Sequence, residues 1–145
     1  MRIMIDTNII IAAAISPSGR AAQAFFKAIT PPYQPIVCDY IVEELHRKFR
    51  QKFPQKQTEL EAFLFNMLLS VKLVKTPVDI TESESHIRDA KDRPILRAAL
   101  DAHADLLLTG DKDFLESSIT DPRIISAAEF LDGDFPDRSL TSTWS

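Results

Sequence analysis

Two apolar runs of this chain each lead into an aspartate, in positions where a folded sheet would bring the two side chains together. The run Met1–Ile5 ends at Asp6, and the run Leu106–Leu108 leads into Asp111. In an open α/β sheet the carboxyl ends of parallel strands share one edge, and ligands bind there. If the two runs form neighbouring strands, Asp6 and Asp111 therefore lie close together.

Further carboxylates accompany this pair. Asp89 and Asp92 stand just before a helix-like run, and Asp113 follows soon after Asp111. Carboxylates held close together repel and raise each other's pKa, and a divalent cation removes that cost. Hard oxygen ligands select Mg²⁺ or Mn²⁺ over zinc. The acidic set therefore predicts a site for one of these two ions.

Each aspartate also has a purely structural interpretation. Asp6 could end a strand in an Asx turn, and Asp92 and Asp113 could cap the helices that follow them. Taken singly, such an aspartate is more often a helix cap than a metal ligand, but several at one sheet edge favour a metal site. Three short polar side chains could orient the carboxylates or could belong to ordinary turns: Thr7, Asn8 and Thr109.

A glutamate and a basic run occupy one predicted helix, for which Asp39 is the expected N-cap and which extends to about Lys52. Glu44 falls nearer than Glu43 to the apolar stripe of this helix, so Glu44 is the better candidate for the acidic centre. The cations that follow form either a solvated helix face or a grip on phosphates. The residues that would make phosphate contacts are Arg47, Lys48 and Arg50.

Composition narrows the classes of protein. Its 145 residues suit one domain. Its net charge of −4 is unlike that of most nucleic-acid-binding proteins, which are basic. A local basic patch and a bound metal could still supply a positive field. Its single cysteine fits a reducing compartment and is too few for a cysteine zinc site. The histidines show no triad or zinc spacing, and there is no phosphate-binding glycine loop. No signal peptide or membrane span is recognisable, so we expect a soluble cytoplasmic protein.

Short apolar runs alternate with stretches of helical periodicity along the chain. The predicted strands are Arg2–Ile5, Gln34–Cys38, Val71–Lys75, Asp105–Thr109 and Arg123–Ile125. The predicted helices are Ile9–Ile15, Ala22–Ile29, Asp39–Lys52, Gln57–Ser70, a segment that begins near Pro94, Lys112–Ser117 and Ala127–Leu131, with a loop or short helix over Pro77–His86. This alternation predicts a three-layer α/β/α sandwich with a central, mainly parallel sheet over residues 1–131. Residues 132–145 are polar and aperiodic, and we expect a flexible tail there.

The helix predicted over Gln57–Ser70 carries apolar residues beyond a single stripe. Phe65 and Leu69 widen its apolar surface. The helix is then either clamped between two neighbours within one chain or in contact with a second subunit, and the first interpretation needs no partner.

Four motifs taken together resemble the PIN-domain nucleases, and most of all the subgroup of VapC-like toxins of toxin–antitoxin pairs. They are MIDTNII at Met4–Ile10, VEELHRKF at Val42–Phe49, DAKDRPILRAAL at Asp89–Leu100 and ADLLLTGDKDFL at Ala104–Leu115. They occur in the family's order, and the family's domain would cover residues 1–131. The resemblance implies a Rossmann-like sandwich and metal-dependent hydrolysis of RNA.

The resemblance also assigns roles to individual residues. The metal ligands that it implies are Asp6, Glu44, Asp92 and Asp111, with Asp89 and Asp113 as additional acidic groups. One or two Mg²⁺ or Mn²⁺ ions would activate a water molecule and neutralise charge on the phosphate, so that no protein nucleophile is needed. The implied partners are an RNA substrate, an antitoxin protein and a second copy of the chain in a homodimer.

Two other functions are compatible with the residues. A haloacid-dehalogenase-type phosphatase also uses a strand-end aspartate and a later Gly-Asp pair, as at Gly110-Asp111, but it needs an acid where this chain has Asn8. A non-catalytic module would bind metal for stability alone and would act by binding RNA or a partner. Turnover of RNA would separate the nuclease from both alternatives.

Overall fold

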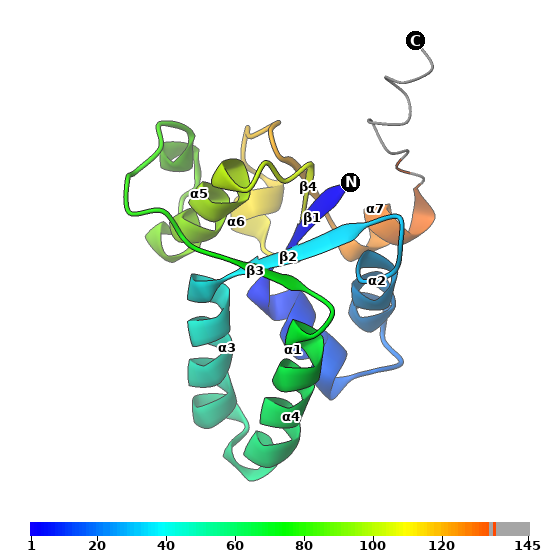
Figure 1. Cartoon of the computed structure of the whole chain (residues 1–145). Coiled ribbons are helices and arrows are strands. Elements are labelled where there is room, and N and C mark those ends of the chain that lie inside the picture. The colour runs from blue at the N-terminus through cyan, green and yellow to red at the C-terminus, as the bar shows by residue number, and fades with distance from the viewer. Residues whose placement is uncertain (134, 136–145) are drawn as a thin grey trace.

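The computed structural model describes residues 1–133 and 135, which form a five-stranded sheet between layers of helices (Figure 1). The strand order is β3-β2-β1-β4-β5, and every neighbouring pair in this sheet is parallel. The strands are β1 (Arg2–Ile5), β2 (Gln34–Cys38), β3 (Lys72–Val74), β4 (Leu106–Leu108) and β5 (Arg123–Ile125). The predicted fold class is confirmed, and the described sheet is wholly rather than mainly parallel.

The helices cover both faces of the sheet. They are α1 (Thr7–Ile15), α2 (Arg20–Ala28), α3 (Asp39–Lys52), α4 (Gln57–Leu68), α5 (Arg93–Asp101), α6 (Lys112–Leu115) and α7 (Ala127–Asp132), with short 3-10 helices η1 (Pro54–Lys56), η2 (Ser83–His86) and η3 (Ala90–Asp92). In Figure 1, α1, α3 and α4 lie below the sheet, whereas α5 and α6 lie above it. Helix α7 packs beside α2.

The strand order reverses between β1 and β4, and this reversal places the ends of both strands at one edge. Met4 lies opposite Leu107, and Ile5 lies opposite Leu108. The chain passes from β1 through β2 to β3 on one side and then crosses to β4 and β5 on the other, as in doubly wound folds. The adjacency of the strands that lead to Asp6 and to Asp111, on which the predicted site depends, is therefore confirmed.

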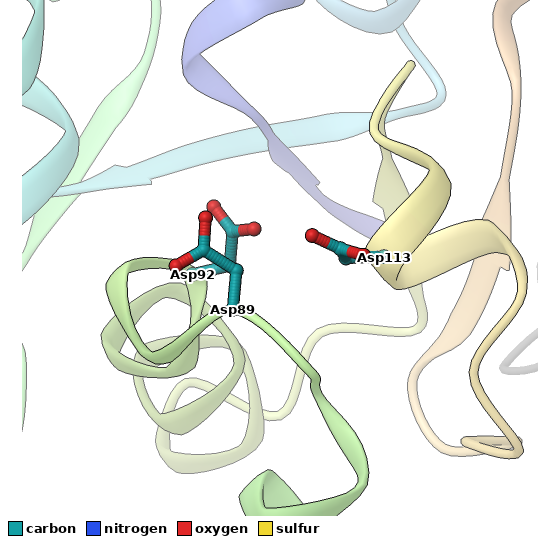
Figure 2. A group of neighbouring side chains, drawn as sticks. All are labelled: Asp89, Asp92 and Asp113. Atoms are coloured by element: carbon teal, nitrogen blue, oxygen red, sulfur yellow. The ribbon is translucent and has the colours of Figure 1, made fainter.

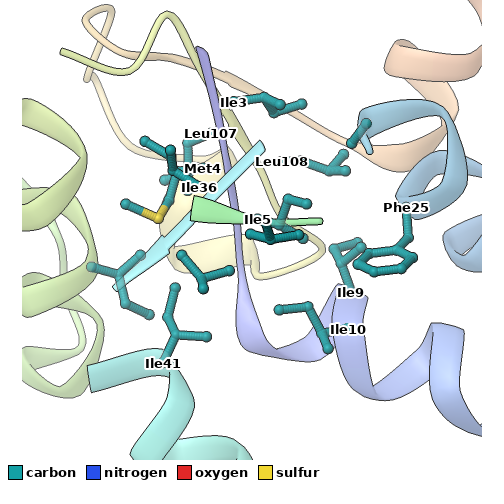
Figure 3. Close-up of a cluster of buried hydrophobic side chains, with 14 of the residues drawn as sticks. Ile3, Met4, Ile5, Ile9, Ile10, Phe25, Ile36, Ile41, Leu107 and Leu108 are labelled. Atoms are coloured by element: carbon teal, nitrogen blue, oxygen red, sulfur yellow. The ribbon is translucent and has the colours of Figure 1, made fainter. Parts of the chain in front are cut away.

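The hydrophobic core fills the space between sheet and helices (Figure 3). All three residues of β4 are buried, as expected for a parallel strand that is covered on both faces. Ile10 of α1, Phe25 of α2 and Ile41 of α3 are almost fully buried and gather around β1. Burial of each such side chain contributes about 1.5–3 kcal/mol, so the core holds these three helices firmly against the strand that ends at Asp6.

Two helix starts differ from their expected form. Helix α1 begins at Thr7, two residues before the predicted start, because Asp6 caps it by accepting a hydrogen bond from the Thr7 N–H at 2.8 Å. The sequence predicts Asp39 as the N-cap of α3, but Asp39 is the first helical residue. Its carboxylate accepts hydrogen bonds from the N–H groups of Tyr40 at 3.0 Å and Thr76 at 2.8 Å, which tie α3 to the chain after β3.

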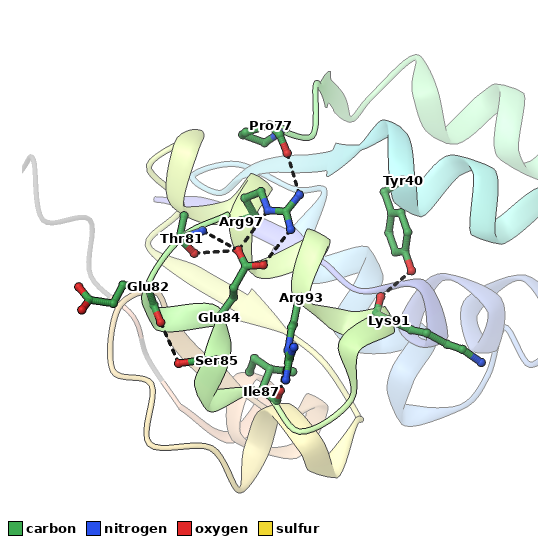
Figure 4. A network of polar contacts seen from close by, with 10 residues as sticks. All are labelled: Tyr40, Pro77, Thr81, Glu82, Glu84, Ser85, Ile87, Lys91, Arg93 and Arg97. Atoms are coloured by element: carbon green, nitrogen blue, oxygen red, sulfur yellow. Dashed lines mark hydrogen bonds and ion pairs between the residues drawn. The ribbon is translucent and has the colours of Figure 1, made fainter. Parts of the chain in front are cut away.

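The segment Pro77–His86, expected as a loop or a short helix, contains η2 and is held by a buried ion pair (Figure 4). Glu84 is 3% exposed and accepts hydrogen bonds from Arg97 at 2.8 and 3.1 Å and from the Thr81 N–H at 2.8 Å. The bonds from Arg97 are the main cause that lowers the pKa of Glu84 to about 2. This network fixes the connection from β3 to η3, which carries part of the acidic set.

At its C-terminal end the described chain includes α7, which reaches Asp132. Phe135 is buried and its ring centroid is 5.8 Å from that of Phe130. The rest of the tail predicted over 132–145 lies outside the described residues. Within residues 1–133 and 135, no single helix is long and apolar enough to cross a membrane, and α1 with α2 reaches that length only as a pair bent by 114°.

Candidate active site

A cavity of about 540 Å³ opens at the edge of the sheet where β1 and β4 end. One part of its lining is acidic and consists of Asp6, Glu44, Asp89, Asp92 and Asp111. The other part is mainly basic and consists of Arg47, Lys48, Lys52 and Lys91, together with Thr7, Asn8, Tyr40 and Gln51. All four ligands that the resemblance implies therefore line one cavity.

Asp6 is 3% exposed and is held by two threonines. Its Oδ1 atom accepts a hydrogen bond from the Thr7 N–H at 2.8 Å, and its Oδ2 atom accepts one from the Thr109 hydroxyl at 2.7 Å. Burial raises the pKa of Asp6 to about 6, against the opposing effect of these two bonds, and the charges of Glu44 and Asp111 add to the rise. Its carboxylate thus caps α1 and also forms part of the acidic wall.

Thr109 joins the ends of β1 and β4. Its hydroxyl donates to Asp6 and accepts a hydrogen bond from the Asp111 N–H at 3.0 Å. Asp111 in turn caps α6, because its Oδ1 atom accepts a hydrogen bond from the Asp113 N–H at 2.9 Å. Thr109 therefore orients two of the predicted ligands with one hydroxyl.

Asp92 differs from these capping aspartates. It holds the N-cap position of α5, but its side chain makes no capping hydrogen bond, and its buried Oδ2 atom accepts no hydrogen bond within the described chain. Burial raises the pKa of Asp92 far above its ordinary value, and the adjacent Asp111 raises it further. Two neighbouring carboxylates repel each other, and a proton or a cation held between them relieves this repulsion. The structure gives Asp92 no capping role.

Asp89, Asp92 and Asp113 form the tightest acidic group (Figure 2). One oxygen atom of each carboxylate lies within 4.8 Å of the other two. Among the residues that the structure describes, no other group of acidic, histidine or cysteine side chains meets this distance. The four predicted ligands are thus less closely gathered than this trio, and Asp92 is the residue that the two sets share.

Two members of the trio have further partners. Asp113 forms an ion pair with Arg88 at 2.8 Å, and Asp89 caps η3 by accepting a hydrogen bond from the Lys91 N–H at 3.0 Å. The guanidinium of Arg88 partly offsets the negative charge on this side of the group. Asp113 does not line the cavity, whereas Asp89 does.

The two neighbouring glutamates of α3 point in different directions. Glu44 is 7% exposed and lines the cavity, whereas Glu43 is exposed to solvent. The Oε2 atom of Glu44 is 3.6 Å from the guanidinium of Arg47, which is almost one turn further along the helix. The orientation predicted from the apolar stripe of α3 is therefore the observed one.

Positive charge reaches the cavity from successive turns of α3. Arg47, Lys48 and Lys52 line it, but Arg50 is exposed on another side of the helix and does not. The ammonium group of Lys48 donates to the side-chain oxygen of Asn8 at 3.1 Å. Asn8, predicted to orient the acidic ligands, here holds a lysine of the basic wall.

Sequence reasoning missed Tyr40 and Lys91 as cavity residues. The Tyr40 hydroxyl donates to the backbone carbonyl of Lys91 at 2.5 Å, and this bond connects α3 to η3. Lys91 directly precedes Asp92, and Tyr40 lies four residues before Glu44, on the same side of α3. Helical spacing counted back from Glu44 would have identified Tyr40.

The donor set fits a hard divalent cation. The acidic lining offers carboxylate oxygens, which Mg²⁺ and Mn²⁺ prefer. The Oδ2 atom of Asp92 and the hydroxyl of Thr7 are buried without a partner in the described chain, and a cation with its water shell would satisfy both. The same charge would offset the repulsion that contributes to the raised pKa values of Asp6 and Asp92.

Comparison with known proteins identifies the family. The sequence model described as PIN domain matches residues 2–113, a stretch that contains every acidic residue of the cavity. This chain belongs to the PIN-domain family. The resemblance seen in four motifs is thereby confirmed, and membership assigns the chain to a class of nucleases. No curated protein matches the chain in sequence.

Solved structures of PIN-domain proteins share the fold. VapBC2 from Rickettsia felis, bound to a DNA fragment from its promoter, matches with a TM-score of 0.67 and 15% identity, over 87% of this chain and 98% of that chain. DNA-bound VapBC from Salmonella typhimurium matches with a TM-score of 0.65 and 14% identity, over 88% of this chain and 98% of that chain. VapBC-1 from nontypeable Haemophilus influenzae matches with a TM-score of 0.58 and 21% identity, over 88% of this chain and 99% of that chain. At these identities the likeness concerns the fold.

Proposed function

We propose that this PIN domain is a metal-dependent endoribonuclease that hydrolyses RNA phosphodiester bonds and acts as the toxin of a toxin–antitoxin pair. The observation that carries the proposal is the carboxylate of Asp92, whose buried Oδ2 atom has no hydrogen-bond partner in the described chain and which lies beside other carboxylates in a cavity that is also lined by basic residues. Stability alone does not account for it, because a buried polar atom without a hydrogen-bond partner is costly. A site for a cation and a phosphate does account for it.

The proposed metal ligands are Asp6, Glu44, Asp92 and Asp111, with Asp89 and Asp113 as further acidic groups nearby. When bound, Mg²⁺ or Mn²⁺ supplies a water molecule of lowered pKa and offsets the charge that develops on the phosphate. Thr109 holds the carboxylate of Asp6 and the backbone of Asp111 in fixed orientation through one hydroxyl. The unpartnered Thr7 hydroxyl is free to hold a water molecule inside the cavity.

RNA is the substrate proposed for the basic wall. Arg47, Lys48 and Lys52 lie along α3 beside the acidic groups and can contact phosphates on one side of the cleaved bond. Such contacts position a nucleic acid without reading its sequence. The choice of RNA over DNA rests on the resemblance to VapC-like ribonucleases.

The toxin role and the antitoxin partner rest on the same resemblance and on the shared fold with VapBC structures. An antitoxin segment that crosses the cavity would carry a cation toward the carboxylates and compete with metal. This role places the protein in the cytoplasm, where its RNA substrate is found, and involves no membrane.

A second copy of the chain is the partner proposed for α4. Phe65 of α4 and Leu69, which directly follows the helix, are 67% and 74% exposed, although Leu60 and Leu64 of α4 are buried. Packing of α4 within its own chain accounts for the buried pair but leaves the exposed pair in water. Adjacent exposed apolar side chains often mark a contact surface, and a homodimer would cover them.

The test of this function is incubation of the purified protein with mixed RNA, in Mn²⁺ or Mg²⁺ and in EDTA. We expect internal cleavage with metal and none in EDTA. RNA that is bound but never cut would support the non-catalytic module instead. Release of phosphate from a phosphomonoester would support the phosphatase, for which the site offers Asn8, bonded to Lys48, where a second acid is required.

A further inference from the structure

Tyr40 gives the cavity a surface that neither metal binding nor phosphate contacts would use. Among the described residues that line the cavity, it is the one aromatic side chain, and the others are polar or charged. The same side chain packs partly against the hydrophobic core. The aromatic side chain therefore lies between the core and an otherwise polar and charged site.

The ring is held at both ends. Tyr40 lies in the first turn of α3, and its hydroxyl donates to the Lys91 carbonyl at 2.5 Å (Figure 4). Because the hydroxyl is already paired, the ring cannot swing freely, and it spans the distance between α3 and η3. The surface that remains for a ligand is the ring rather than the hydroxyl.

The ring also lies among the groups of the proposed active site. Glu44 follows it by one helical turn, and its hydrogen-bond partner Lys91 directly precedes Asp92. Arg47 lies one turn beyond Glu44 on the same side of α3. A flat group that rests on the ring would therefore hold an attached phosphate near the acidic wall and near a cation.

We propose that Tyr40 is the stacking platform for an unpaired nucleobase that adjoins the phosphate to be hydrolysed. Bases that are splayed out of single-stranded RNA stack on aromatic side chains, whereas paired bases of a duplex present no free face. This inference rests on the proposed function, because it adds a base-binding subsite to the proposed ribonuclease centre.

The experiment compares two labelled oligomers of about six nucleotides, a length within the range of single-strand sites. One is a mixed-sequence RNA, and the other is an abasic ribose-phosphate chain of the same length. Binding is measured by fluorescence anisotropy in EDTA, so that nothing is cut. We expect Tyr40→Leu to weaken binding of the RNA by about fivefold or more and to leave binding of the abasic chain unchanged, because stacking needs the base. Tyr40→Phe, which keeps the ring, should stay within about twofold of wild type on both oligomers.

Two results would overturn the platform while leaving the ribonuclease intact. One is equal binding of the RNA by wild type and by Tyr40→Leu. The other is an equal loss in Tyr40→Phe and Tyr40→Leu, which would make the residue a strut between α3 and η3. If the wild type binds neither oligomer, the platform is overturned, and cleavage of RNA in Mn²⁺ decides separately whether the proposed function stands.

A second variant covers the case in which Tyr40→Leu does not fold. Tyr40→Trp keeps a flat ring and adds a fluorophore at the proposed contact. Because the chain already contains Trp144, the emission is compared with that of the wild type, and only the emission added by Tyr40→Trp should be quenched by the RNA and not by the abasic chain, since stacking needs the base. Equal emission with both oligomers would contradict the platform.

Discussion

Among the aspartates that line the cavity in the described chain, Asp92 is the one whose side chain makes no capping hydrogen bond. Asp6, Asp89 and Asp111 each accept such a bond, at 2.8, 3.0 and 2.9 Å, so helix capping alone explains an aspartate at each of these positions. Asp92 has a buried oxygen without a donor and lies beside another carboxylate. That arrangement destabilises the metal-free protein, and a bound cation would reverse the effect.

Replacing Asp92 should separate stability from metal binding. Asp92→Asn removes a repelled charge, so we expect the metal-free protein to gain stability by on the order of 1–3 kcal/mol. Mn²⁺ should raise the melting temperature of the wild type, since it binds the folded state, and should raise that of the variant much less. Thermal melts in EDTA and in Mn²⁺ measure both effects, with the exposed Glu43→Gln as the matched control. An equal Mn²⁺-induced rise in the melting temperature of wild type and Asp92→Asn would contradict a metal site that includes Asp92.

The raised pKa of Asp6 sets a pH dependence for the metal-free protein. Between its ordinary value of 3.8 and its folded value of about 6, the folded state binds a proton that the unfolded chain does not bind. Stability should therefore rise as pH falls through about 6, by roughly 1.3 kcal/mol between pH 7 and pH 5 and by about 3 kcal/mol in all once the pH is below 3.8. Asp92, whose pKa is also raised, acts in the same direction.

Glu84 acts in the opposite direction at lower pH. Its pKa falls from 4.5 to about 2 in the folded state, so its contribution is present above 4.5 and is lost as pH falls toward 2. We therefore expect urea unfolding in EDTA to show maximal stability near pH 4, where the gain from Asp6 and the loss from Glu84 balance. A steady loss of stability from pH 8 down to pH 5 would contradict the assignment for Asp6.

At the scale of elements, α3 joins the acidic and basic parts of the cavity. Glu44, Arg47 and Lys48 lie within little more than one turn, so docking of this one helix places a carboxylate and two cations beside the ends of β1 and β4. Ile41, Leu45 and Phe49 are fully buried and fix its rotation. The rotation decides which of its many charges face the cavity.

Two cations of α3 should differ in their effect on RNA binding. Lys52 lines the cavity and Arg50 does not. Lys52→Ala should weaken RNA binding and lower the slope of log affinity against log salt by about 0.7–0.9, as expected for one lost phosphate contact. Arg50→Ala removes the same charge from the same helix and should have little effect, and neither variant should change the Mn²⁺-induced thermal shift. Equal losses in the two variants would show that α3 acts only through its overall charge.

The sequence predicts local structure better than it predicts which residues share the cavity. Each of the five strands was recognisable because a buried parallel strand is a short apolar run between turn residues. Glu44 was distinguishable from Glu43 because helical periodicity indicates which side of the helix is buried. The place of Tyr40 and Lys91 depends on how α3 docks against η3, which no local pattern encodes. The docking of α3 also explains why Arg50, which the sequence places among the phosphate-binding residues, lies away from the cavity. A contact between distant segments likewise explains Asp39, which was expected as an N-cap but whose carboxylate accepts a hydrogen bond from Thr76.

At the scale of the whole molecule, two surfaces of the described chain carry the proposed contacts. One is the charged cavity at the carboxyl edge of the sheet. The other is the exposed apolar side of α4, formed by Phe65 and Leu69. The two surfaces differ in chemistry, and this difference suits a charged substrate at the first and an apolar partner at the second.

The surface on α4 should control assembly. We expect the wild type to be a dimer at micromolar concentration, and Phe65→Glu or Leu69→Glu to shift it to a monomer, because a buried unpaired carboxylate opposes association. Multi-angle light scattering measures the mass. Ile80→Glu, at a residue that is 77% exposed on a different segment, should remain a dimer. A wild type that is monomeric under these conditions would count against the homodimer.

The most direct measurement of the proposed chemistry is cleavage of a labelled RNA at saturating Mn²⁺ by the wild type and by Asp111→Asn. Asp111 lies at the edge of the sheet, and the amide oxygen of an asparagine can still accept the capping bond of α6, so the variant should fold, as a parallel thermal melt would show. We expect it to lose most of its cleavage while Glu43→Gln stays fully active, since only the first removes a charged ligand of the cation. Full cleavage by a well-folded Asp111→Asn protein would contradict hydrolysis at this acidic centre.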